Sequence, residues 1–296
     1  MKYAPFERLV TPARPSAGLG RLVVGIIVII SLHFAVIQGV FAVLRAFLSA
    51  ETFFDLVSGI QRADTAASLL AVLVLTGSMG LGAIVACELV NKRAFIGLIG
   101  PRRAATRQFW QVLRMLALVT LAAFVVLRFV SAEVLLPGVA LGTWLQLLPL
   151  TLLALLIQTG AEELVFRGYL QSQLAARFNN PAVWIFVPSL IFAVLHYQPE
   201  VYGANARFFV IWSFLFGVAA ADLTARTGTL GPAIALHLAN NFTALGVVSL
   251  NGDMSGLALW QFSYGPEAEA TIRADMPAEF LFIVIYWLAA RLAVRV

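Results

Sequence analysis

Ionisable side chains stand inside one of the most apolar stretches of this chain, where charge is least expected. The stretch GAEELVFRGYL (160–170) holds Glu162, Glu163 and Arg167 within six residues. Ionisable groups at membrane depth are rare, and most of them face a bundle interior or a wet cavity. They are therefore functional candidates, and the chemistry open to them is acid–base catalysis or ion pairing.

Two further stretches add imidazole and amide groups. FAVLHY (192–197) contains His196, and ALHLANNF (235–242) contains His237, Asn240 and Asn241. The chain has three histidines in all, so two of them stand in these stretches. The third, His33, has no polar neighbour in the sequence, and we expect it to form an interhelical hydrogen bond or to face a cavity.

Helical periodicity separates the charges of the first stretch. Glu163 and Arg167 stand at i,i+4 with the carboxylate first, which is the favourable order for an ion pair on one helix face. Such a pair offsets part of the desolvation of both groups and can also hold helices together. Glu162 is turned about 100° away. We therefore expect Glu163 and Arg167 to support the site and Glu162 to be available for chemistry.

Spacing along the chain brings Glu162 and His196 to the same depth. The sequence Asn179, Asn180, Pro181 predicts a turn. Glu162 lies 17 residues before Asn179, and His196 lies 16 residues after Asn180. At 1.5 Å per residue, both are about 25 Å from the turn along their helices. An antiparallel hairpin therefore brings Glu162 and His196 to the same depth.

A second face carries His237 with an asparagine. Asn241 is at i+4 from His237 and Asn240 is at i+3, so either amide can share the face of the histidine. The spacing does not decide between them, although we assign Asn241 to the site.

Together these residues predict hydrolysis of an amide. Glu162 with His196 can polarise a water molecule, the carboxylate acting as general base, while His237 and Asn241 can donate hydrogen bonds to an oxyanion. Glu162, His196 and His237 could instead hold zinc with an open water position, although the HExxH zinc motif is absent. These residues alone do not distinguish a water molecule activated by a metal ion from one activated by Glu162.

The composition predicts the surroundings of this site. Of 296 residues, 61% are hydrophobic and 12% are charged, with a mean hydropathy of +0.91, whereas soluble domains carry about 25% charged residues. The composition therefore predicts an all-α, polytopic transmembrane bundle. Its single cysteine, Cys87, excludes a disulfide framework within the chain.

Eight apolar segments are long enough to be membrane spans. We place them at 22–44, 66–90, 112–132, 145–175, 182–198, 208–225, 230–250 and 278–296. They form a single integral membrane domain, 1–296, with a catalytic core at about 145–250. Residues 97–115, before the third span, are expected to form either a short amphipathic helix or a loop.

Lysine and arginine orient these spans. Basic clusters occur in residues 1–21 and 91–107, while the alternate loops are acidic or nearly neutral. The positive-inside rule places both termini, and the N-terminal segment 1–21, in the cytoplasm. The basic surplus then reflects membrane orientation and not nucleic-acid binding. The expected partners are the lipid bilayer and a peptide or membrane-protein substrate, and the expected location is a bacterial inner membrane.

The polar stretches also resemble a known family. E-E-x-x-x-R (Glu162, Glu163, Arg167), F-x-x-x-H (Phe192, His196) and H-x-x-x-N (His237, Asn241) resemble the three motifs of the CPBP, or Abi, family. That family includes intramembrane proteases similar to CAAX prenyl protease 2, and proteins similar to lysostaphin resistance protein A. The resemblance covers residues 160–241.

The resemblance implies an eight-helix core with a catalytic cavity in the membrane. It also implies that Glu162, His196, His237 and Asn241 are catalytic and that Glu163, Arg167 and Phe192 support them, with zinc an open question. CAAX cleavage is a family label here and not the predicted substrate. Two other classes remain: a transporter or ion relay using the same charges, and a non-catalytic immunity or scaffold protein of the same fold.

Overall fold

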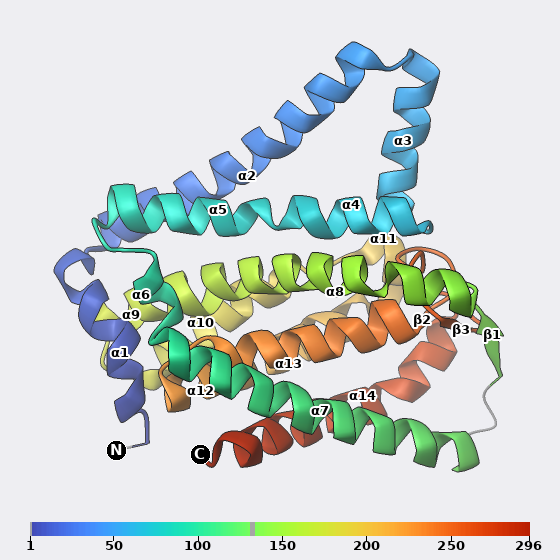
Figure 1. The fold of residues 1–296 in the computed structure, drawn as a ribbon. Helices are drawn as coiled ribbons and strands as arrows, with labels where there is room; N and C mark the ends of the chain where they lie inside the picture. The colour runs from blue at the N-terminus through green and yellow to red at the C-terminus, as the bar shows by residue number, and fades with distance from the viewer. Residues whose placement is uncertain (1, 131–133) are drawn as a thin grey trace.

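The protein is a bundle of helices with a small sheet at one end (Figure 1), in a computed structural model that describes residues 2–130 and 134–296. The first half contains η1 (Ala4–Phe6), α1 (Glu7–Val10), η2 (Thr11–Ser16), α2 (Leu19–Phe47), α3 (Ala50–Arg62), α4 (Ala66–Thr76), α5 (Ser78–Val85), η3 (Ala86–Val90), α6 (Ile96–Ile99), α7 (Arg102–Val130) and β1 (Leu135–Pro137).

The second half contains α8 (Leu141–Glu163), η4 (Leu164–Gln171), α9 (Ser172–Arg177), α10 (Pro181–Val194), α11 (Pro199–Tyr202), η5 (Gly203–Asn205), α12 (Ala206–Thr227), α13 (Gly231–Asn241), η6 (Phe242–Val247), β2 (Val248–Ser249), β3 (Trp260–Phe262) and α14 (Glu269–Val294). Strand β3 lies between β1, which is antiparallel to it, and β2, which is parallel. The all-α membrane fold expected from the sequence is confirmed, and the sheet is only a small addition.

Six helices of the described residues are long and apolar enough to cross a membrane. The spans expected at 182–198 and 230–250 are shorter helices in the structure, because α10 has 14 residues and α13 has 11 before it continues as η6. Most residues of α13 are buried, so its surroundings are other helices over most of its length. The multi-pass architecture is thus present, while the number of complete crossings expected from hydropathy is not established.

The third span begins earlier than the sequence predicted. Its expected range, 112–132, ends outside the described residues, and its start moves back to Arg102, where α7 begins. The segment 97–115 is accordingly neither a short amphipathic helix nor a loop. Gly100 adopts a φ of +82°, which separates the single turn of α6 from α7. A left-handed residue followed by Pro101 therefore fixes where the long helix starts.

Both chain ends lie at the same end of the bundle, where α7 begins and α9 ends (Figure 1). The basic segment 91–101 packs at this end, because Arg93 donates to the Leu9 carbonyl and Ile99 accepts from the amide of Leu230, which precedes α13. Basic and acidic loops that alternate along the chain predict that both termini lie on one side of the membrane, which agrees with this common end. That this side is the cytoplasm stays a prediction.

The N-terminal segment, expected as a cytoplasmic extension, is packed against the bundle. Phe6, Leu9 and Ala13 are between 0% and 3% exposed, so residues 4–16 close that end of the core. The hydroxyl of Tyr3 donates to Asp222 of α12 over 2.8 Å, and Asp222 also accepts from Arg226. Burial, and then the bond to Asp222, raise the pKa of Tyr3 to about 12, so its phenol stays a donor at neutral pH.

Removing this hydroxyl should loosen the N-terminal segment. We expect Tyr3→Phe to lower the free energy of unfolding by about 1 to 2 kcal/mol, because Asp222 loses one of its donors. Thermal unfolding in detergent measures the effect. Glu7→Gln, which removes an exposed pair with Arg14, is the control and should change stability by less than about 1 kcal/mol. Equal stability of Tyr3→Phe and the unaltered protein would contradict this role.

Candidate active site

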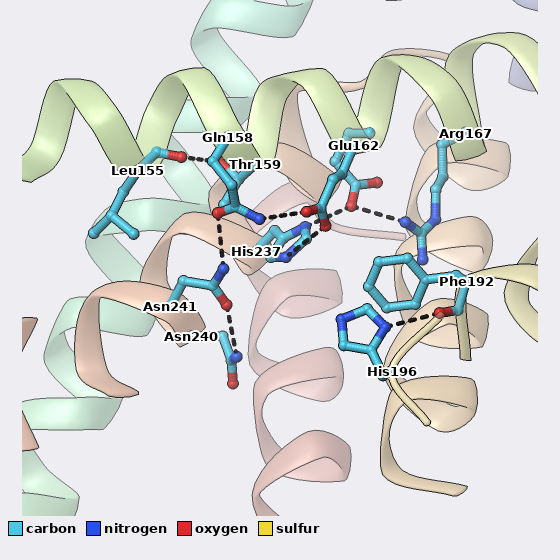
Figure 2. Close-up of polar contacts among 11 residues, drawn as sticks. Leu155, Gln158, Thr159, Glu162, Arg167, Phe192, His196, His237, Asn240 and Asn241 are labelled. Atoms are coloured by element: carbon cyan, nitrogen blue, oxygen red, sulfur yellow. Dashed lines mark hydrogen bonds and ion pairs between the residues drawn. The ribbon is translucent and has the colours of Figure 1, made fainter. Parts of the chain in front are cut away.

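Three segments bring the polar residues of the sequence together in the bundle (Figure 2). Helix α8 supplies Glu162 and Glu163 near its end, α13 supplies His237 and Asn241, and His196 follows directly after α10. Figure 2 shows the side chains of α8 and α13 facing one another. Two of these elements, α8 and α13, change their helical geometry at the site itself.

Helices α8 and α13 both become π-helices at the site. The π-helix η4 begins directly after Glu163, and η6 begins directly after Asn241. Wider helical turns of this kind are rare and are frequently found at functional sites, where they alter which side chains share a face. Their coincidence with two of the three polar stretches supports a functional reading of the cluster.

Glu163 is the buried centre of the supporting residues. It is 0% exposed, and its Oε1 accepts from Arg167 Nη1 over 2.9 Å. The same oxygen lies 2.8 Å from His237 Nδ1. The ion pair expected from the i,i+4 spacing is therefore present. Glu163 has a second role that periodicity could not reveal, because it holds the ring of a histidine on another helix.

Phe192 connects Arg167 to His196. The guanidinium carbon of Arg167 lies 4.8 Å from the centre of the Phe192 ring, a cation–π contact. The His196 ring is 4.4 Å from the same ring centre, and its Nδ1 is 2.8 Å from the Phe192 carbonyl. A carbonyl only accepts, so Nδ1 carries the proton and Nε2 of neutral His196 is an acceptor.

Glu162 faces the histidine of α13. Its Oε2 lies 3.6 Å from His237 Nε2, and this oxygen is buried with no hydrogen-bond partner among the described residues. Because Nδ1 of His237 faces the Glu163 carboxylate, that nitrogen carries the proton and Nε2 accepts. Two accepting atoms thus face each other across a distance too long for a direct hydrogen bond.

His196 is not the imidazole paired with Glu162, although the two were expected to act together on one water molecule. Among the described residues, no hydrogen bond or ion pair joins the two, and His237 is the imidazole that approaches Glu162. His196 is linked to His237 only through Phe192, whose ring centre is 6.0 Å from that of His237. Depth along a helix was the basis of the prediction, and rotation about the axis decides which side chains meet.

Asn241, and not Asn240, is joined to the carboxylates. Asn241 Nδ2 donates to Gln158 Oε1 over 2.9 Å, and Gln158 Nε2 donates to Glu162 Oε1 over 2.6 Å. Asn240 reaches the site only by donating to Asn241. The hydrogen bonds thus connect Asn241 to Glu162 more directly than Asn240, and the catalytic role of Asn241 stays a prediction.

Gln158 is the residue of this cluster that sequence reasoning missed. It is 7% exposed and stands four residues before Glu162, so the two share a helix face. A search for amides at i−4 from each buried carboxylate would have found it. An uncharged side chain attracts less notice in an apolar stretch than a charged one.

The donors do not converge as a zinc site does. A catalytic zinc ion needs three protein ligands around one point, and Glu162, His196 and His237 are suitable types. Within residues 2–130 and 134–296, however, no three His, Cys, Asp or Glu side chains are grouped to hold a metal ion. The residues therefore do not fit a zinc ion in this arrangement.

The remaining histidine and the cysteine lie apart from this cluster. His33 of α2 is 2.6 Å from the Ser78 hydroxyl, so it forms the interhelical hydrogen bond expected for it. Cys87 is buried and donates to the Arg93 carbonyl. Neither residue has a place in the chemistry of the cluster.

The cluster lies within a segment that matches a family of proteases. A family model described as "Type II CAAX prenyl endopeptidase Rce1-like" matches residues 143–243, the segment that carries Gln158, Glu162, His196, His237 and Asn241. Over these residues the chain resembles the CPBP family. The resemblance inferred from the three motifs is thereby confirmed, and with it a protease-type fold in a multi-pass membrane protein.

A curated relative matches a similar share of the chain. The uncharacterized protein YyaK of Bacillus subtilis (strain 168) is 30% identical over 115 residues, which is 38% of each chain. The match thus covers about two fifths of that relative's length, and its name assigns no activity. No solved structure matches the chain.

Proposed function

We propose that this protein is an intramembrane endopeptidase that hydrolyses a peptide bond of a membrane-associated protein or peptide. The observation that carries the proposal is the pair of accepting atoms, Glu162 Oε2 and His237 Nε2, facing each other at 3.6 Å in a buried site. The protease family of residues 143–243 supports the same reaction class.

Glu162 is the general base of this proposal. A water molecule that donates one hydrogen to Glu162 Oε2 and the other to His237 Nε2 presents its oxygen lone pairs to a substrate carbonyl. As that oxygen attacks the carbonyl carbon, Glu162 takes the proton. The C–N bond then breaks, the proton passes to the leaving amine, and the oxygen of water remains in the new carboxyl group.

Asn241 and His196 are the proposed hydrogen-bond donors to the carbonyl oxygen and the leaving group. One hydrogen of Asn241 Nδ2 is donated to Gln158, so the second is available to an oxyanion. His196 is half-buried and its Nε2 makes no hydrogen bond among the described residues. In protonated form, this nitrogen can donate to the oxyanion or to the departing amine.

The proposed location follows from the distribution of charge and not from the family label. The basic end of the bundle is proposed to face the cytoplasm of a bacterium, with the protein in its inner membrane. The description of the family model names a CAAX prenyl endopeptidase. We propose no prenyl requirement for this chain, because nothing in the cluster is specific for an isoprenoid.

Hydrolysis can be tested in proteoliposomes. Bacterial membrane proteins reconstituted with this protein in ¹⁸O-labelled water should yield new peptide ends, each with one labelled carboxyl oxygen, by mass spectrometry. Because no three donors among the described residues converge on a metal, dialysis against a chelator, with or without added zinc, should leave the rate unchanged. A rate lost on chelation and restored by zinc would contradict the glutamate mechanism. Proton flux without cleavage would instead support the ion-relay class.

A further inference from the structure

Gln158 is the side chain that joins the carboxylate of α8 to the amide of α13 (Figure 2). Among the described residues, no other side chain forms hydrogen bonds with both Glu162 and Asn241. Both of its polar atoms are therefore committed, and its 7% exposure leaves little solvent to compete for them. A buried amide with both ends occupied holds its partners in one geometry.

Chemistry fixes the direction of every amide in this chain of bonds. An ionised carboxylate only accepts, so the amide nitrogen of Gln158 must face Glu162. The Gln158 oxygen then faces Asn241, which must present its nitrogen, and the Asn241 oxygen faces the donor of Asn240. The negative charge of Glu162 thus orients an amide on another helix, through Gln158.

Two consequences bear on the reaction. Glu162 Oε1 is occupied by Gln158, so Oε2 is the single oxygen left to face His237 and take a proton. Asn241 is held with its nitrogen, and not its oxygen, turned to the side of Gln158. We propose that Gln158 is a positioning residue that aligns the base and the amide donor. This inference rests on the proposed peptidase function.

Substitution of the amide separates alignment from packing. Gln158→Met keeps the length of the side chain but makes neither bond, so kcat should fall about 10- to 100-fold, the effect of losing a hydrogen bond to a charged group. KM should change less than about threefold, because both polar atoms of Gln158 bond to Glu162 and Asn241 and the proposal gives it no contact with the substrate. The measurement is the steady-state rate of cleavage in detergent or liposomes.

Gln158→Glu adds a readout that packing alone would not change. When protonated, the introduced carboxyl has the donor and acceptor pattern of the amide, whereas its ionised form repels Glu162. Its rate relative to the unaltered protein should therefore rise as the pH falls. The same ratio for Gln158→Met should stay flat, because the neighbouring charged and ionisable groups, Glu162, Glu163, Arg167, His196 and His237, are present in both proteins.

Gln171→Met is the matched control. Gln171 lies on the same continuous helix in η4, is 0% exposed, and donates to the Ala221 carbonyl over 3.0 Å. Its loss removes a buried hydrogen bond to a backbone carbonyl of α12, and this bond involves neither Glu162 nor Asn241. It should lower thermal stability without lowering kcat. A kcat for Gln158→Met equal to that of Gln171→Met would overturn the proposal, as would a flat pH ratio for Gln158→Glu.

Two further experiments distinguish failure of this inference from failure of the proposed function. Cleavage by the unaltered protein that Glu162→Gln abolishes supports the function whatever Gln158 does. Infrared difference spectra of the unaltered protein against Glu162→Gln isolate the Glu162 carboxylate band without any substrate. That band should shift in Gln158→Met and stay fixed in Gln171→Met. A band that does not move in Gln158→Met would overturn the alignment even if no substrate is cleaved.

Discussion

Glu162→Gln should lower kcat for peptide hydrolysis by about 10³-fold, within the range attributed to general base catalysis. The introduced amide has the shape of the carboxylate, and its oxygen can still accept from Gln158, so the fold should be kept. The proton acceptor facing His237 is what disappears. Steady-state cleavage and thermal unfolding in detergent, measured on the same preparation, check both halves of this expectation.

A carboxylate away from the cluster controls for loss of charge. Glu88 of η3 is exposed, and Glu88→Gln should leave the rate of cleavage within about twofold, as expected for a surface substitution. Full activity of Glu162→Gln would rule out this carboxylate as the base. Loss of activity together with loss of folding would point to a structural role instead.

Arg167→Met should cause the largest loss of stability of any substitution considered for this protein. The guanidinium is 0% exposed and pairs with Glu163, which is equally buried. Breaking such a pair by removing one partner costs about 3 to 5 kcal/mol, because a buried charge is left uncompensated. The loss should be measured as a fall in the free energy of unfolding in mixed micelles.

The double substitution Glu163→Gln/Arg167→Met distinguishes charge from packing. It removes both charges, so it should recover much of the stability lost in Arg167→Met. Activity should remain low, because Glu163 also holds His237 Nδ1. A double variant no more stable than Arg167→Met would show that the pair's charges are not the source of the effect.

The sequence was sufficient for properties that depend on local order along the chain. Hydropathy over long segments predicts helices in a membrane whatever their neighbours, because backbone groups in lipid must be satisfied within the helix. The i,i+4 spacing of Glu163 and Arg167 predicts their ion pair for a similar reason, since both lie on one helix face. The three motifs likewise identified the family that matches residues 143–243.

The tertiary structure decided what depends on rotation and packing between helices. Helix length placed Glu162 and His196 at one depth, but the packed orientation of α13 brings His237 to Glu162 instead. It also selects Asn241 through Gln158, an uncharged residue that no motif marked. The hydropathy of the N-terminal segment did not indicate that it packs against the bundle. In the structure, however, Phe6 and Leu9 are buried there.

The physical reason for this division is the range over which each interaction acts. Hydrophobic content and helical spacing depend on residues that are close together in the sequence. The sequence by itself therefore determined a helical membrane protein whose apolar segments contain a carboxylate, two imidazoles and an amide. Contacts between residues 74 or 83 positions apart, such as His237 with Glu163 and Asn241 with Gln158, depend on how each helix is rotated in the bundle. Only the packing of side chains sets that rotation, and it alone decided which groups face one another.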